Sequence, residues 1–98
     1  MSEKHLQKEV VDYLRSKNLF VFSINPPDRK RMTYGTIMQL PDLYVVDLNL
    51  FIELKAKEYK SAHPERQAKQ EAVRNDLIAH GAKAIKITSL EELNEYIS

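Results

Sequence analysis

Residues 41–55 read PDLYVVDLNLFIELK, and this stretch decides the fold of the 98-residue chain. It contains two apolar-rich runs, 42–47 and 50–55, which are separated by Leu48 and Asn49. Runs of this length, rich in Val, Ile, Phe and Tyr, are typical of β-strands. The short polar interruption between them indicates a turn, so the sequence predicts a two-stranded hairpin at the centre of the protein.

Periodicity and stop signals predict the other elements. Pro64 suits the first turn of a helix and Gly81 the left-handed residue after its end, while residues 89–92, SLEE, form a capping box. The expected helices cover 3–17, 64–80 and 89–97, and the expected further strands cover 19–24 and 84–88. The order αβββαβα predicts an α/β fold, a small mixed β-sheet flanked by helices.

Composition limits the class of protein. Ninety-eight residues predict one domain over 1–98, and 43% hydrophobic with 30% charged residues predict a globular chain. The absence of cysteine excludes a disulfide framework, a cysteine zinc site and a thiol nucleophile. Apolar runs such as 43–46 are far shorter than a membrane span, so we expect no membrane association. These features fit a cytoplasmic protein of bacterial or phage origin.

The central hairpin also carries the candidate chemistry. Alternation along a strand puts Glu53 and Lys55 on one face, and antiparallel neighbours lie about 5 Å apart, so the hairpin can bring Asp42 beside Glu53. Two adjacent carboxylates repel each other unless a proton or a cation lies between them, and Mg²⁺ is a natural occupant. Lys55 can orient water and stabilise a phosphate oxygen. Alternatively, Asp42 and Glu53 are ordinary hairpin charges paired with lysines.

Two helical residues are further candidates. Glu3 lies close to the line of Leu6 and Val10 on the inward side of the first helix, where it can join a metal site, although exposure is the default near a chain terminus. Gln70 lies on the inward line of the second long helix, where its amide can support Lys55 or bind a phosphate oxygen. The alternative for Gln70 is a boundary residue whose amide reaches solvent.

Together these residues resemble the virus-type replication-repair nuclease (VRR-NUC) domain, a branch of the PD-(D/E)xK restriction-endonuclease-like superfamily. The resemblance covers nearly the whole chain and is carried, in order, by Glu3 and Gln7, Pro41 and Asp42, Glu53 and Lys55, Gln70, and Gly81. The family usually has glycine shortly before its Pro-Asp pair, whereas this chain has Gln39 and Leu40 there.

The resemblance implies roles for these residues and an activity for the protein. Asp42, Glu53 and the backbone carbonyl of Leu54 would bind Mg²⁺, for which Mn²⁺ would substitute. Lys55 would position the attacking water, Gln70 would support the site, and Glu3 would be the acid of the first helix. Stand-alone family members imply a homodimer that cleaves branched DNA, such as four-way (Holliday) junctions, by attack of metal-activated water.

Basic residues predict where DNA would be held. Arg29, Lys30 and Arg31 form the densest basic cluster, in a long loop before Asp42, and Lys57 follows the hairpin. Such side chains neutralise phosphates without reading sequence. The alternative is a solvated basic turn.

Aromatic candidates for stacking on bases are sparse in the sequence. The candidates are Tyr34, Tyr44 and Tyr59. Because they are few, we expect contacts with the DNA backbone to dominate over base stacking. Two other functions stay open beside the nuclease: a catalytically silent nucleic-acid-binding or assembly module that retains the fold, and a small α/β interaction subunit without a DNA role.

Overall fold

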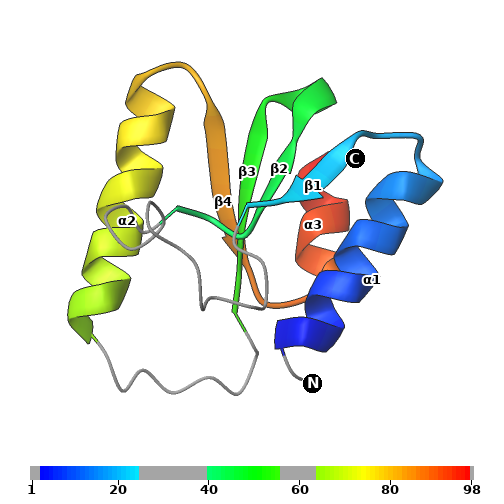
Figure 1. Cartoon of the computed structure of the whole chain (residues 1–98), viewed down its shortest axis with the longest axis horizontal. Helices are drawn as coiled ribbons and strands as arrows, with labels where there is room; N and C mark the ends of the chain where they lie inside the picture. Colours follow the sequence, from blue (N-terminus) through cyan, green and yellow to red (C-terminus); the bar gives the residue numbers. More distant parts are fainter. Residues whose placement is uncertain (1–2, 25–39, 56–63, 98) are drawn as a thin grey trace.

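The computed structural model describes residues 3–24, 40–55 and 64–97 (Figure 1). Along the chain, its elements are α1 (Glu3–Ser16), β1 (Val21–Ser23), β2 (Leu43–Val45), the 3₁₀ helix η1 (Val46–Leu48), β3 (Leu50–Leu54), α2 (Pro64–Ala79), β4 (Lys83–Ile87) and α3 (Leu90–Ile97). The predicted order of α-helices and β-strands, αβββαβα, is confirmed over these residues. The basic loop before Asp42 lies outside them.

The four strands form one mixed sheet in the order β1-β2-β3-β4. β1 pairs with β2 and β2 with β3 in antiparallel fashion, while β3 and β4 are parallel. A parallel pair needs a crossover connection, and α2 lies within that connection. The predicted mixed sheet with flanking helices is therefore confirmed.

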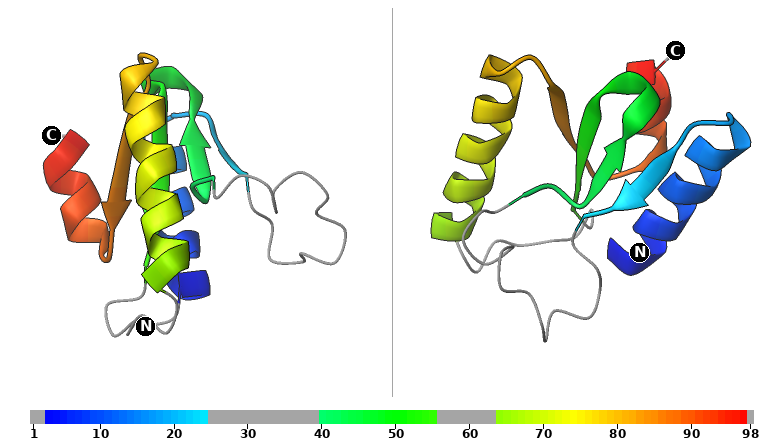
Figure 2. Two further views of the ribbon diagram at one scale, coloured as in Figure 1. Left: turned by 90° about the vertical axis from the view of Figure 1, so that its left-hand side faces the viewer. Right: turned by 45° about the horizontal axis from the view of Figure 1, so that its top comes forward.

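Helices cover the sheet from both sides (Figures 1 and 2). α2 packs against β4 on one side, whereas α1 and α3 lie together on the other, where the hydroxyl of Tyr13 donates to Oδ1 of Asn94 at 2.5 Å. The buried apolar side chains come from every strand and from α1 and α3: Leu6, Val10, Leu14, Val21, Leu43, Val45, Leu50, Ile52, Leu54, Ile87 and Leu93. None of the described helices has the length and apolar character needed to cross a membrane.

The predicted helix ends are confirmed. Asn18 follows α1 with φ of 61°, and Gly81 follows α2 with φ of 99°, both in the left-handed region. At the start of α3, the backbone N–H of Thr88 donates to Oε1 of Glu92 at 2.7 Å, and that of Glu92 donates to the hydroxyl of Ser89 at 3.4 Å. These bonds satisfy donors that a helix start leaves free.

The hairpin turn is longer than predicted. Instead of a two-residue turn at Leu48 and Asn49, η1 and Asn49 together connect β2 to β3, and β2 is shorter than the expected strand. The first strand is shortened too, to three residues. Within this turn, Oδ1 of Asp47 accepts the N–H of Phe20 at 2.6 Å, which ties the turn to the residue before β1. Asn49, at φ of 49°, then reverses the chain.

Candidate active site

The register of the sheet brings the two predicted acids together. Leu43 on β2 pairs with Ile52 on β3, and Asp42, which directly precedes β2, lies beside Glu53, where the two carboxyl groups interact. The N–H of Asp42 donates to the Ile52 carbonyl at 3.0 Å, and the N–H of Leu54 donates to Oδ2 of Asp42 at 2.8 Å. Side chains directly opposite each other in an antiparallel pair share a face. The predicted pairing of the acids is therefore present.

Glu53 is a buried carboxyl group, only 2% exposed. Its pKa is raised from 4.5 to about 8, chiefly by burial and then by the neighbouring Asp42 carboxyl, through repulsion and a hydrogen bond. The positive charges of Lys55 and Arg74 lower it to a smaller extent. Oε1 of Glu53 is buried and has no hydrogen-bond partner in the described structure. A buried polar atom without a protein partner is typically satisfied by water, an ion or a ligand.

Two cationic side chains accompany the acid pair. Lys55 directly follows β3, where its N–H donates to the Ile87 carbonyl at 3.0 Å, and it is half-buried. Arg74 comes from α2, is also half-buried, and acts electrostatically on Glu53. Sequence analysis missed Arg74. The available signal was its position four residues after Gln70, which puts both residues on one side of the helix.

The structure places the two helical candidates differently. Gln70 on α2 is buried, with 7% of its surface exposed, so its expected inward position is confirmed. Glu3 is exposed at the start of α1. Its helix packs on the face of the sheet that carries Leu54, whereas the side chains of Asp42 and Glu53 belong to the other face. The structure does not bring Glu3 to the acid pair, and the described ranges contain no cluster of three or more Asp, Glu or His suited to a metal ion.

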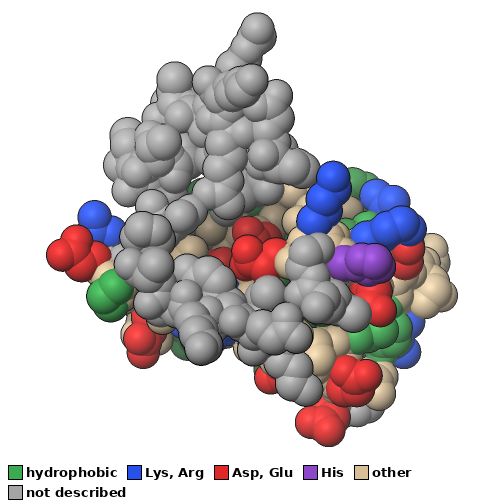
Figure 3. Space-filling view, turned by 90° about the horizontal axis from the view of Figure 1, so that it is seen from below, with side chains coloured by type: hydrophobic (Ala, Val, Ile, Leu, Met, Phe, Trp, Pro, Cys, Tyr) green, Lys and Arg blue, Asp and Glu red, His purple; other side chains and the backbone are tan. Residues whose placement is uncertain are grey.

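One face of the molecule shows acidic side chains near its centre. In the view from below, acidic side chains gather there, with Lys and Arg side chains to one side (Figure 3). The four residues predicted to contact DNA fall in the parts of the chain that the structure does not describe: Arg29, Lys30, Arg31 and Lys57.

Comparisons with protein-family models, curated proteins and solved structures each found no match. The family resemblance is therefore carried by the motif residues alone, and it stays a prediction.

Proposed function

We propose that the protein is a Mg²⁺-dependent endonuclease that hydrolyses phosphodiester bonds in branched DNA, such as four-way junctions, and that its fold is of the restriction-endonuclease type. One observation carries this proposal. Glu53 is a buried acid with an unsatisfied oxygen, it lies across from Asp42, and two cationic side chains act beside the pair. Perturbed acids of this kind, clustered with cations, are typical of functional sites.

The residues of this site fit a divalent cation. Asp42 and Glu53 would hold Mg²⁺, and the family resemblance adds the carbonyl of Leu54. Mg²⁺ commonly binds through one or two carboxylates and retains several waters, so a third acid such as Glu3 is not needed. An ion would also offset the repulsion from Asp42 that, after burial, contributes most to the raised pKa of Glu53. When bound, Mg²⁺ supplies Lewis-acid chemistry to the phosphate.

The neighbouring side chains can then serve the hydrolysis. In an in-line displacement, the water oxygen bonds to phosphorus and gives up one proton to the surrounding water, the bond to the leaving oxygen breaks, and that oxygen takes up one proton. The Lys55 ammonium can orient the water and stabilise charge on a non-bridging oxygen. Arg74 adds a second positive charge from the α2 side, and the Gln70 amide, which both donates and accepts, can brace Lys55.

A homodimer is part of this proposal. One site hydrolyses one strand, so paired cuts across a junction need two sites in a fixed relation. A two-fold dimer provides them through a single self-complementary surface.

The direct test uses the wild-type protein and a labelled four-way junction. We expect cleavage with Mg²⁺ or Mn²⁺, slower cleavage of linear duplex of the same sequence, and none with EDTA. Junction binding without cleavage in either metal, over roughly pH 6 to pH 9, would contradict the nuclease proposal and favour the silent binding module.

Phosphate contacts of the basic loop can be tested by salt dependence. Replacing Arg29, Lys30 and Arg31 together by alanine should reduce the slope of log binding constant against log salt by up to about 3, since each neutralised phosphate contributes about 0.9. The matched control removes three exposed charges from α1 and from the residue that follows it: Lys8, Arg15 and Lys17. Equal slopes for wild type and the loop variant would remove the argument that the loop contacts phosphates.

A further inference from the structure

Aromatic side chains form a row across the sheet. The register pairs Phe22 with Tyr44 and Tyr44 with Phe51, so these three share one face. Their ring centroids lie 5.7 Å and 4.5 Å apart, and the ring of Phe20, the residue before β1, lies 6.3 Å from that of Phe22. We call these four residues the aromatic row. Sequence analysis considered only tyrosines and missed it.

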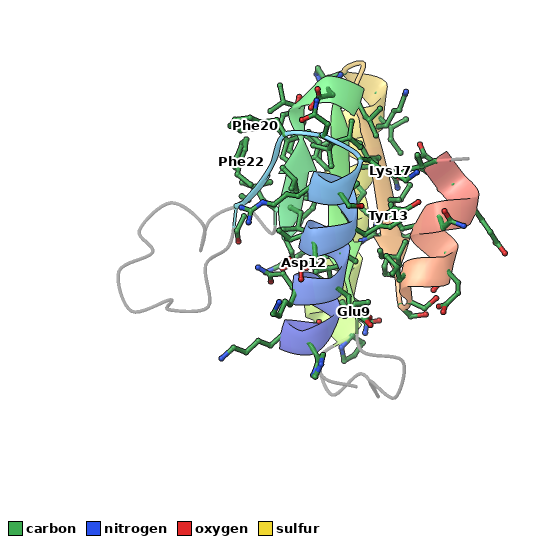
Figure 4. The ribbon with its side chains drawn as sticks, turned by 90° about the vertical axis from the view of Figure 1, so that its right-hand side faces the viewer. Glu9, Asp12, Tyr13, Lys17, Phe20 and Phe22 are labelled. Carbon is green, nitrogen blue, oxygen red and sulfur yellow. The ribbon has the colours of Figure 1, made fainter. Side chains whose placement is uncertain are left out.

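The outer end of the aromatic row is open to solvent. Phe20 is 65% exposed and Phe22 is 46% exposed, because α2 covers this face of the sheet at β4, on the opposite edge. Figure 4 shows Phe20 and Phe22 next to each other at the side of the protein, away from α1. The planes of these two rings meet at 75°, and those of Phe22 and Tyr44 at 65°. Edge-to-face packing leaves ring faces that no neighbouring ring covers.

The aromatic row lies directly beside the acid pair. Asp42 is two residues from Tyr44 on β2, and Glu53 is two residues from Phe51 on β3. Side chains two residues apart on a strand share a face and lie about 7 Å apart. Phe22, Tyr44 and Phe51 and the acids therefore belong to consecutive rows of side chains on one face of the sheet, and Phe20 lies on the side of Phe22 away from the acids.

We propose that the aromatic row binds the bases of an unpaired DNA segment whose backbone continues into the acid pair. This proposal rests on the proposed nuclease function, in which the acid pair is the site of cleavage. It adds that the substrate carries single-stranded nucleotides next to the cleaved bond. Aromatic rings on an open surface stack with any base, because every base has a π-face. The branch point of a junction or flap supplies such bases.

The size of the exposed surface favours bases over a second copy of this chain. At roughly 200 Å² per aromatic side chain, the open parts of Phe20 and Phe22 together offer about 200 to 250 Å². A stable protein interface buries about 800 Å² per partner. Two rings suffice to stack one or two bases, whereas they are a small fraction of a dimer interface.

The test measures binding of fluorescent oligothymidylate by anisotropy in EDTA, so that neither metal nor cleavage is involved. Phe22→Leu keeps an apolar side chain but removes the ring, and we expect about tenfold weaker binding, with duplex affinity unchanged. Phe22→Tyr should restore binding. Tyr96→Leu on α3, where the ring is 47% exposed, is the matched control and should bind as wild type.

A second variant, Phe20→Ser, should also weaken binding of the single strand, and circular dichroism verifies that each variant is folded. The proposal is overturned if both variants bind oligothymidylate as wild type does, or lose affinity for duplex equally. If wild type sediments as a dimer and the variants as monomers, while their affinity for the single strand is unchanged, the aromatic row is instead an interface between copies of this chain. Because no cleavage is measured, an inactive wild type leaves this result intact and contradicts only the nuclease proposal.

Discussion

Asp42→Asn is expected to slow junction cleavage by at least about a thousandfold while the protein stays folded. Asparagine removes the negative charge that would hold Mg²⁺. Its amide oxygen can still accept the N–H of Leu54, which now donates to Oδ2 of Asp42 at 2.8 Å. Single-turnover cleavage of labelled junction measures the rate, and anisotropy in EDTA verifies that binding is retained.

Companion variants separate charge from structure. Asp42→Ala removes both the charge and the acceptor for the N–H of Leu54. It should therefore slow cleavage and also lower the melting temperature. With the N–H left unsatisfied, the free energy of unfolding should fall by about 1 to 3 kcal/mol. Lys55→Met should slow cleavage by about a hundredfold or more, and Lys83→Met, at an exposed lysine on β4, should not. Cleavage by Asp42→Asn and Lys55→Met at wild-type rates would refute the assignment of the site.

The second large effect is the pH dependence of the free energy of unfolding of the metal-free protein. Because the pKa of Glu53 is raised from 4.5 to about 8 on folding, unfolding at intermediate pH releases a proton. This contribution to stability is fully present below the unfolded value of 4.5. It decreases by about 1.4 kcal/mol per pH unit as pH rises, and is lost once pH passes the folded value. Wild type should therefore melt at progressively lower temperature toward alkaline pH.

Glu53→Gln should remove this dependence, because a buried amide resembles the protonated acid and cannot ionise. Above the folded pKa of about 8 and without metal, we expect the variant to melt at a higher temperature than wild type. Mg²⁺ should reverse the order, since it stabilises only wild type, and its affinity should fall about tenfold per pH unit below that pKa as protons compete. Thermal melts over a pH series, with and without Mg²⁺, provide both readouts. Parallel pH curves for the two proteins, or equal stabilisation by Mg²⁺, would contradict the prediction.

Local pattern predicted most of the fold but not the register of the hairpin. The alternation that marks both strands is local, and so are the signals at Pro64 and Gly81. The turn instead includes a bond from Phe20 to Asp47, which are 27 residues apart. A two-residue turn at 48–49 would have placed Tyr44, rather than Asp42, across from Glu53. The acids meet because the turn is longer, and a long-range contact accompanies that turn.

The features of the site that were missed depend on which element covers which face. The helix phase of α1 was predicted well, since Leu6 and Val10 are buried, yet Glu3 does not reach the pair because its helix packs on the other face of the sheet. Phe20 and Phe22 have the composition of a buried strand. Their exposure follows from the placement of α2 over β4, which no local pattern specifies.

The hydrogen bond from Leu54 to Asp42 has a consequence for the choice of ion. Oδ2 of Asp42 accepts this bond, whereas Oδ1 of the same carboxylate does not take part in it. Ca²⁺ seeks about six to eight oxygens, often with both oxygens of one carboxylate, whereas Mg²⁺ accepts single-oxygen contacts and fills its octahedron with water. At the proposed metal site, this hydrogen bond should therefore favour Mg²⁺ over Ca²⁺.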